Sequence, residues 1–599
     1  MVLAVLGLWA AGLAIERRLP RVPRSLVFAA LALLLIFFTS AASAPAWRIA
    51  ALKFCARQAQ GALLALCLAD QLATWGWPIA RRLGLGLIGG AAISALLGVI
   101  EIGEAPPALA LLAIFKEQPT MAGGLLRLSA TFAYANIAAM YYEATLPICL
   151  AVVGLAARGA PRRLLGGTAV LLGGATLLTY SRAALLTAAV ATVAVLLGAI
   201  WLGRRLAGGA SIERSESDLV EARGSAVFVD DDSVQAARRV GRLCMVLLAL
   251  LAGVVLLNPA FRVRVAAPDV ADWYRADYAV AALPGLAPNE VLFTPVTILN
   301  RGLVTWRSAG LRPVALSYHW LDPQTRRVVR FNGRRTLLSR PVEPGDALSL
   351  NAEIQAPEKP GDYVLAWDMV VEHSGWFSER GNSLAEVAVR VAGRPAASQP
   401  APRAEPANMP QQIIVRPAPP PRSQLWDAAV RMWRARPLLG IGPDVFRHAY
   451  GPELGLRIWD DRLHTNSLYL ELLVGAGVAG LAAFLLLIGA VLWPAARLLT
   501  TTDDRRVAVD GRWTMDDGRW TADIVYHLSS IQSAMDINHH RQIWMALGCA
   551  VALLTFLVHG LLDMFLEYSA TNLLLWALLG GLGGLTVNSD SDDRAQHMQ

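Results

Sequence analysis

The chain has 599 residues, of which 55% are hydrophobic and 17% are charged, and its mean hydropathy is +0.44. This composition is too apolar for an ordinary soluble protein, and several apolar runs approach the length at which a helix crosses a bilayer. The formal net charge of +8 does not call for a nucleic acid partner, because most arginines flank apolar runs, where membrane topology accounts for them. The sequence therefore predicts a polytopic α-helical membrane protein with membrane lipids around it and no nucleic acid partner.

Apolar runs predict about eleven transmembrane helices. They cover residues 2–15, 25–46, 57–77, 83–100, 134–155, 164–179, 183–201, 243–257, 468–493, 543–562 and 569–585. The first run is short for a span, and we expect a helix upstream of it. A secretory signal peptide is a poor alternative, because basic residues follow this run and none precedes it.

Arginine-rich loops predict the orientation of these spans. On one side lie three groups of arginines: Arg17, Arg18, Arg21 and Arg24; Arg81 and Arg82; and Arg158, Arg162 and Arg163. The positive-inside rule makes that side cytoplasmic, although Arg48, Lys53 and Arg57 go against it. Residues 258–463 then face the periplasm or cell exterior, and 203–242 and 495–542 face the cytoplasm. We expect a multi-pass membrane protein.

The outward-facing region interrupts the membrane portion, which comprises residues 1–258 and 468–587. Short alternating apolar and polar runs, separated by turn signals such as Pro344-Gly345-Asp346, predict a β-sandwich at 279–391. Its tryptophan-rich strands resemble immunoglobulin-like modules appended to bacterial cell-surface and glycan-processing proteins, where a spacing or docking role is expected. Residues 392–421 have the composition of a semi-rigid proline-rich linker, and 422–467 form the remaining extracytoplasmic loop.

No cofactor or metal is expected. All five cysteines lie in or beside predicted membrane segments, which leaves neither a disulfide framework nor a cysteine zinc site in the insert. His539-His540 lacks further ligands at suitable spacing. The glycine pattern Gly475-Ala-Gly477-Val-Ala-Gly480 lies inside an apolar span with no preceding strand, so helix packing is favoured over dinucleotide binding.

Three polar clusters lie at the predicted outer ends of spans. They are Arg127-Leu-Ser-Ala-Thr-Phe-Ala-Tyr-Ala-Asn136, Thr179-Tyr-Ser-Arg182 and the loop from Gly440 to Glu471. Polar groups at membrane depth are costly and usually face a cavity or a partner. Three clusters on one side of the membrane therefore predict one shared, outward-facing site.

The order of these motifs resembles the O-antigen ligase and polymerase superfamily. The resemblance rests on Arg-x-Ser-x-Thr-Phe-x-x-x-Asn, Tyr-Ser-Arg, Gly-Ile-Gly-Pro-Asp-x-Phe and His464-Thr465-Asn466-Ser-Leu-Tyr-Leu-Glu471, and it covers about 127–202 and 440–585. It implies transfer of a glycan from a polyprenyl-diphosphate carrier to an acceptor hydroxyl on the outer face of the inner membrane. The acceptor stays open between a lipid A core sugar, a growing polysaccharide and a protein hydroxyl.

Candidate roles follow from this chemistry. Arg182 is expected to hold the diphosphate through its planar donor fork, with Arg127 and Arg462 as further candidates; the alternative is that these arginines only reach the headgroups or solvent. His464 is expected to act as general base, unless it only forms hydrogen bonds at the start of a helix. Substrate-binding candidates complete the site: Asn136, Asn466, His559 and Asp563. Asn466 has the alternative of a helix cap, and His559 with Asp563 that of an interfacial polar pair.

Two other functions remain possible on the sequence alone. A lipid-linked glycan transporter or flippase would place ionisable residues near the membrane midplane, and Glu143 is the one such feature. A surface-glycan-binding receptor would depend on the β-sandwich. Neither explains the polar clusters at the outer ends of the spans as well as a transferase does.

Overall fold

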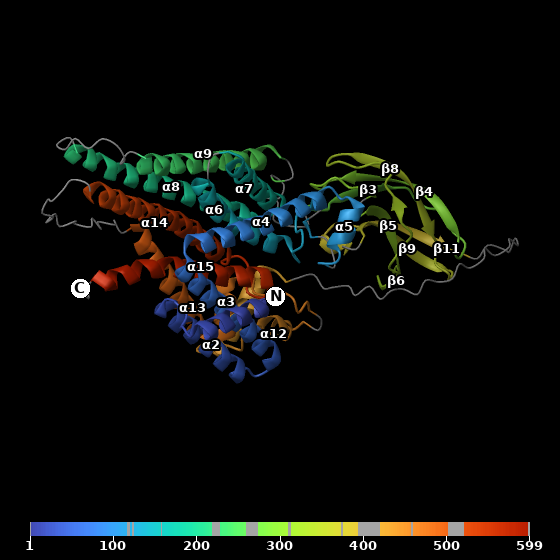
Figure 1. The fold of residues 1–599 in the computed structure, drawn as a ribbon. Helices are drawn as coiled ribbons and strands as arrows, with labels where there is room; N and C mark the ends of the chain where they lie inside the picture. Colours follow the sequence, from blue (N-terminus) through green and yellow to red (C-terminus); the bar gives the residue numbers. More distant parts are fainter. Residues whose placement is uncertain are drawn as a thin grey trace. The chain divides into compact units, whose positions relative to one another are not determined.

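The computed structural model describes residues 2–116, 120–122, 125–156, 159–217, 228–258, 261, 273–309, 313–372, 375–392, 420–456, 459–500 and 520–596 (Figure 1). Most of the predicted linker, residues 393–419, lies outside this description. The chain forms two compact units. A helical unit comprises residues 1–118, 128–253 and 415–599, and a β-rich unit comprises 119–127 and 254–414.

Helices make up the first unit. They are α1 (Val2–Glu16), α2 (Arg24–Ser43), α3 (Arg48–Trp75), α4 (Trp77–Ile102), α5 (Pro106–Leu112), α6 (Ala135–Leu155), α7 (Ala160–Leu178), α8 (Arg182–Ser217), α9 (Phe228–Leu257), α11 (Arg422–Ala435), α12 (Phe446–Glu453), α13 (Leu468–Thr500), α14 (Trp520–His559) and α15 (Ser569–Gln596). Among the described residues, eight helices are long and apolar enough to cross a membrane: α2, α4, α6, α8, α9, α13, α14 and α15. The prediction of a polytopic helical membrane protein is confirmed at this level.

The other three predicted spans are also helical, as α1, α3 and α7, but they do not reach the same combination of length and hydropathy. The number eleven therefore stays a prediction. Only Gly76 separates α3 from α4, so α4 begins at Trp77, six residues before the predicted start of this span at 83. Proline is favoured in the first turn of a helix, and Pro78 starts α4 there, so Arg81 and Arg82 lie within the helix.

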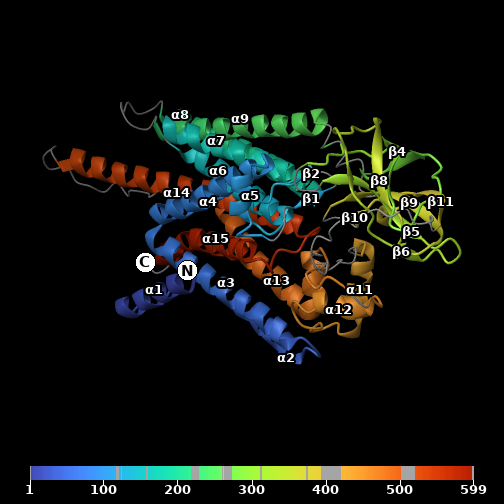
Figure 2. The same cartoon turned by 90° about the vertical axis from the view of Figure 1, so that its right-hand side faces the viewer.

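Small residues allow close packing between helices that are distant in the sequence (Figure 2). Helix α3 packs against α15, α2 against α13, and α6 against α14 and α7. A Cβ atom on Gly61 of α3 would lie 2.1 Å from the Trp576 ring of α15, so this contact requires glycine. The same interface contains a buried hydrogen bond of 3.0 Å from the Trp576 indole to Gln58.

The second unit contains two antiparallel sheets that share one apolar core. One sheet has the order β3 (Ala276–Val280), β4 (Val291–Asn300) and β8 (Ala347–Gln355). The other contains β5 (Val314–Leu321), β6 (Val328–Arg330), β7 (Thr336–Leu337), β9 (Gly361–Val371), β10 (Gly375–Trp376) and β11 (Ala385–Val391), with β9 between β5 and β11. The short strands β1 (Met121–Ala122) and β2 (Leu125–Leu126) form a separate hairpin.

The core of this sandwich is aromatic. Trp306, Trp320 and Trp367 are almost completely buried in it, together with residues from both sheets. Trp273 belongs to the same core and β3 begins at Ala276, so the module starts earlier than the predicted residue 279. The likeness to an immunoglobulin domain stays a prediction.

Candidate functional site

A break in helix α13 fixes the loop that precedes α12. At Gly477 the backbone leaves the helical conformation, with φ 67° and ψ −169°. The residues around the break pair with the backbone of loop 437–442: Ile441 N to Val474 O, Gly442 N to Gly475 O and Val478 N to Pro437 O, each 2.9 Å. A Cβ atom on Gly477 would lie 2.2 Å from the Leu438 carbonyl oxygen, so only glycine allows this approach. The glycine pattern here therefore serves backbone packing.

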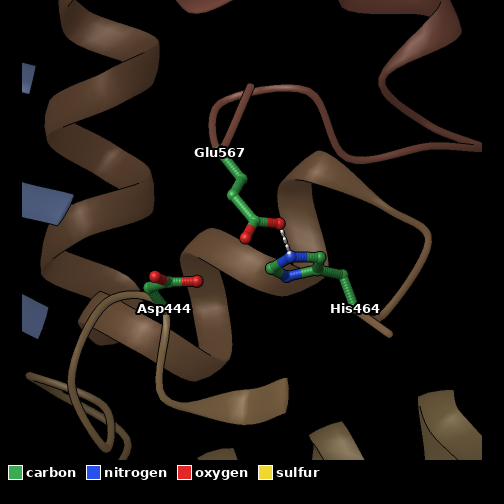
Figure 3. Close-up of side chains that lie close together, drawn as sticks. All are labelled: Asp444, His464 and Glu567. Atoms are coloured by element: carbon green, nitrogen blue, oxygen red, sulfur yellow. Dashed lines mark hydrogen bonds and ion pairs between the residues drawn. The ribbon is translucent and has the colours of Figure 1, made fainter. Parts of the chain in front are cut away.

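His464 lies just before α13, and Figure 3 shows its imidazole hydrogen-bonded to Glu567 with Asp444 nearby. Its Nδ1 is 3.2 Å from Glu471 Oε1, and its Nε2 is hydrogen-bonded to Glu567 Oε2. The side chain of His464 is 5% exposed. Glu471 is fixed in turn, because the Thr465 amide donates to its second oxygen at 3.0 Å. Both ring nitrogens therefore have an acidic partner.

Glu567 reaches this position from the loop that joins α14 to α15. The Leu468 amide, at the start of α13, donates to the carbonyl oxygens of Gly560 and Asp563 at 2.7 and 3.0 Å. A Cβ atom on Gly560 would lie 3.0 Å from the Leu468 side chain. These contacts hold the loop against the first turn of α13, and they use a helix N–H group that has no partner within the helix.

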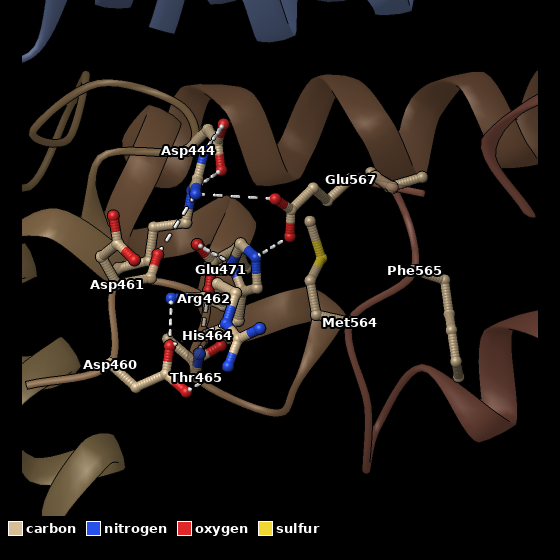
Figure 4. Close-up of polar contacts among 12 residues, drawn as sticks. Asp444, Asp460, Asp461, Arg462, His464, Thr465, Glu471, Met564, Phe565 and Glu567 are labelled. Carbon is tan, nitrogen blue, oxygen red and sulfur yellow. Dashed lines mark hydrogen bonds and ion pairs between the residues drawn. The ribbon is translucent and has the colours of Figure 1, made fainter. Parts of the chain in front are cut away.

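Asp444 lies near His464 and Glu567 (Figure 4), and two arginines donate hydrogen bonds to it. Arg447 of α12 donates to both carboxylate oxygens at 2.8 and 3.1 Å, and Arg57 of α3 donates at 3.3 Å. Arg447 also lies 3.7 Å from Glu567, which connects the two halves of the site. Asp444 has a positive φ of 64°, a conformation that aspartate tolerates better than most residues.

The charges change the protonation of these groups. Burial alone would lower the pKa of His464, but Glu471 and Glu567 outweigh it and raise that pKa to about 10. Burial opposes a low pKa for Glu567, yet His464 and Arg447 lower it. Burial raises the pKa of Asp444 in spite of Arg447. At neutral pH the imidazole is therefore protonated and Glu567 is ionised.

Asp444, His464 and Glu567 also have the spacing of metal ligands, since one ligand atom from each lies within 4.8 Å of the others. The surroundings suit an ion-pair network better, because Arg447 already donates to both oxygens of Asp444. Two guanidinium groups next to the same carboxylate would also repel a divalent cation. The prediction that no metal takes part therefore stays a prediction, with an electrostatic argument in its favour.

Several predicted site residues lie next to this centre. Asn136, in the first turn of α6, donates to Asp563 at 2.6 Å, and Asp563 belongs to the loop that carries Glu567. Arg462 forms two hydrogen bonds with Asp460, of 3.0 and 3.1 Å, on the loop before His464.

His559 ends α14 as a completely buried side chain, and its Nδ1 is paired with Glu143 of α6. Thr187 of α8 donates to the other oxygen of that carboxylate. The burial of Glu143, the one feature that suggested transport, is thus accounted for by its partners.

The other predictions have a different outcome. Arg182 begins α8 with an exposed side chain, and within the described part of the chain no hydrogen bond or ion pair of this guanidinium is found. Arg127 belongs to the second unit and stays a prediction. Asn466 adopts a positive φ of 53° and is half-buried, while the neighbouring Ser467 accepts a 3.5 Å hydrogen bond from the Leu470 amide, as a helix cap does.

Sequence reasoning assigned no role to the charged partners of His464. Asp444 and Glu471 lie within the sequence motifs that also contain the predicted site residues, so the motifs could have indicated them. Arg57 was an exception to the positive-inside rule, and that exception could have indicated that it has a partner within the protein. No sequence pattern indicated Arg447 or Glu567. Glu567 lies 103 positions from His464 along the chain, and only the fold brings the two together.

One family model, described as O-antigen ligase, matches residues 411–485 of this chain. No curated protein matches the chain. The matched segment contains α11, α12, His464 and the first half of α13, and therefore most of the site built above. Residues 411–485 are therefore similar to the O-antigen ligase family, and eight of the described helices are long and apolar enough to cross a membrane.

Proposed function

We propose that the protein transfers a glycan from a polyprenyl-diphosphate carrier to an acceptor hydroxyl on the outer face of the bacterial inner membrane. One observation carries the proposal: a buried histidine with a carboxylate on each ring nitrogen lies beside two arginines at the start of a membrane helix. This arrangement falls largely within the segment that matches the O-antigen ligase family.

The leaving diphosphate needs cationic partners. Arginine presents a planar and permanently charged donor fork to phosphate oxygens. Arg447 and Arg57 both pair with Asp444 beside His464, and their side chains are 18% and 34% exposed. Arg182, and then Arg127 and Arg462, are further candidates for the diphosphate. An incoming anion would compete with Asp444 for Arg447 and Arg57, which makes that carboxylate a placeholder in the free protein.

The acceptor needs a group that takes its proton. His464 is the central group, oriented by Glu471 through Nδ1. The pKa of His464 near 10 means that the imidazole must first lose a proton if it is to act as the base. Asn136 and Asp563, which are paired 2.6 Å apart, and the nearby Asn466 and His559 are proposed to bind substrate around this centre.

A deletion and complementation experiment tests the function. Cells that lack the gene should accumulate polyprenyl-diphosphate-linked glycan on the outer leaflet, where a membrane-impermeant lectin detects it on spheroplasts. The native gene should clear this material, and a His464→Ala variant expressed at the same level should not. Short single-unit glycans would indicate a polymerase, whereas full-length lipid-linked polymer would indicate a ligase. Accumulation confined to the cytoplasmic leaflet would instead favour a flippase and contradict the proposal.

A further inference from the structure

Glu567 lies between His464 and Arg447. Its carboxylate bridges His464 Nε2 and the Arg447 guanidinium. Its side chain is 18% exposed, compared with 5% for His464, 4% for Glu471 and 2% for Asp444. Glu567 is thus the most accessible of these four side chains, and it lies outside the segment matched by the family model.

The imidazole has no free lone pair in this arrangement. Glu471 faces Nδ1 and Glu567 faces Nε2, so each ring N–H donates a hydrogen bond to a carboxylate when the ring is charged. A protonated imidazole cannot accept a proton from a hydroxyl group. The carboxylate of Glu567, held ionised by the positive groups around it, can do so.

We propose that Glu567 is the catalytic base of the transfer reaction and that His464 is the cation that positions it. This inference rests on the glycan transferase function proposed above. The acceptor hydroxyl gives its proton to a Glu567 oxygen while its own oxygen forms a bond to the anomeric carbon of the donor sugar. The bond between that carbon and the diphosphate oxygen breaks, and its electron pair leaves with the polyprenyl diphosphate. The proton then passes from the exposed edge of Glu567 to water.

Charged groups from four elements face Glu567. His464 lies on the loop before α13, Arg447 on α12 and Arg57 on α3, while Asp444 lies on the loop before α12. The first three favour the ionised carboxylate. The positive charge of His464 and Arg447 also lies near the position where the diphosphate leaves, so the groups that hold the base would also stabilise the leaving group.

A pair of variants distinguishes the two possible bases. Glu567→Gln preserves shape but removes the proton-accepting charge, and Glu453→Gln is a matched control on α12 whose carboxylate pairs with Arg431 outside the site. Purified full-length protein in nanodiscs would be assayed at pH 7 with donor glycolipid and acceptor extracted from the deletion strain. We expect Glu567→Gln to lower turnover by roughly 10² to 10⁴, the usual contribution of a general base. Binding of undecaprenyl diphosphate should persist and Glu453→Gln should match wild type.

The opposite result has a clear meaning. If His464 is the base, Glu567→Gln frees Nε2 and removes one cause of the raised pKa, so turnover at pH 7 should hold or rise. That outcome would overturn the inference and leave the transferase function intact. Glu567→Asp retains a carboxylate and should recover part of the lost turnover. If Glu567→Asp is as inactive as Glu567→Gln, the assignment of Glu567 as the base is also overturned. Failure of the wild-type protein to transfer any glycan would overturn the proposed function itself.

Discussion

Arg57 of α3 donates a hydrogen bond to Asp444 across 3.3 Å, although 387 positions separate the two residues in the chain. Asp444 is 2% exposed, so its charge depends on Arg57 and Arg447 for compensation. This contact also explains a basic residue on the side of the membrane where the charge rule predicts few. The arginine is kept there by a partner within the protein.

Removing Asp444 should therefore destabilise the protein as well as the site. We expect Asp444→Ala to lower the free energy of unfolding by roughly 3 kcal/mol, because breaking a buried ion pair leaves uncompensated charge. Arg57→Ala should cost less, since Arg57 is partly exposed. Denaturant unfolding in detergent of both single variants and the double variant would measure the coupling. Strictly additive effects would contradict a direct interaction.

Stability should fall at alkaline pH because of His464. Its pKa is near 6.5 in the unfolded chain and about 10 in the folded protein. The stabilisation from the charged ring is therefore complete below about pH 6.5 and disappears as the pH rises through about 10. The difference in Tm between wild type and His464→Gln should shrink over this range. A difference that is independent of pH would argue against a charged imidazole in the site.

The break in α13 gives a prediction that involves no charge. Gly477→Ala should lower Tm strongly and reduce activity, because the residue has a φ of 67° and its new Cβ would meet the Leu438 carbonyl oxygen. Gly489→Ala in the same helix is the control, since no atom lies within 4 Å of the added Cβ. Alanine is favoured over glycine within a helix, so the control should be neutral or slightly stabilising. Equal effects of the two substitutions would rule out this role for the break.

Donor binding tests Arg182. If its guanidinium holds the diphosphate, Arg182→Lys should weaken the binding of undecaprenyl diphosphate, because lysine keeps the charge but not the bidentate fork. Arg204→Lys at an exposed position of the same helix provides the control. Unchanged affinity in Arg182→Ala would show that this arginine only reaches the headgroups and would leave Arg447 and Arg57 as the candidates.

Thiol labelling tests the orientation. A cysteine at Ser339, which is exposed in the β-sandwich, should react with a membrane-impermeant reagent on spheroplasts, and one at Ser217 should not. The five native cysteines are buried, so the background should be low. Reversed labelling would place the site on the cytoplasmic face and contradict the proposed topology.

Local sequence patterns could predict the elements of this protein but not all of its site. Long apolar runs have one physical solution in a bilayer, which is why the eight clear spans could be found from the sequence. Alternation of apolar and polar residues likewise predicted strands such as β4 and β8. Helix ends were less accurate, because Arg81 and Arg82 indicated a loop while the first-turn proline Pro78 allowed α4 to begin before them.

The residues of the site could be predicted only where they share one short sequence motif. His464 could be found because it lies beside Glu471 and Asn466 in one short motif. Its partners Arg57 and Glu567 could not, because their role depends on a distance in space and no local pattern encodes that distance. Arg182 stands in a recognisable motif and stays a prediction, whereas Arg447, to which the sequence assigned no role, lies 3.7 Å from Glu567.

The site combines Arg57, near the start of the chain, with Glu567, near its end, and this has a consequence for biosynthesis. During insertion into the membrane, Arg57, Asp444 and His464 are made before the loop between α14 and α15. A ribosome-bound or truncated chain that ends before Glu567 therefore has its cationic groups but lacks the carboxylate that we propose as the base. We therefore expect no glycan transfer from such chains until the loop between α14 and α15 is in place.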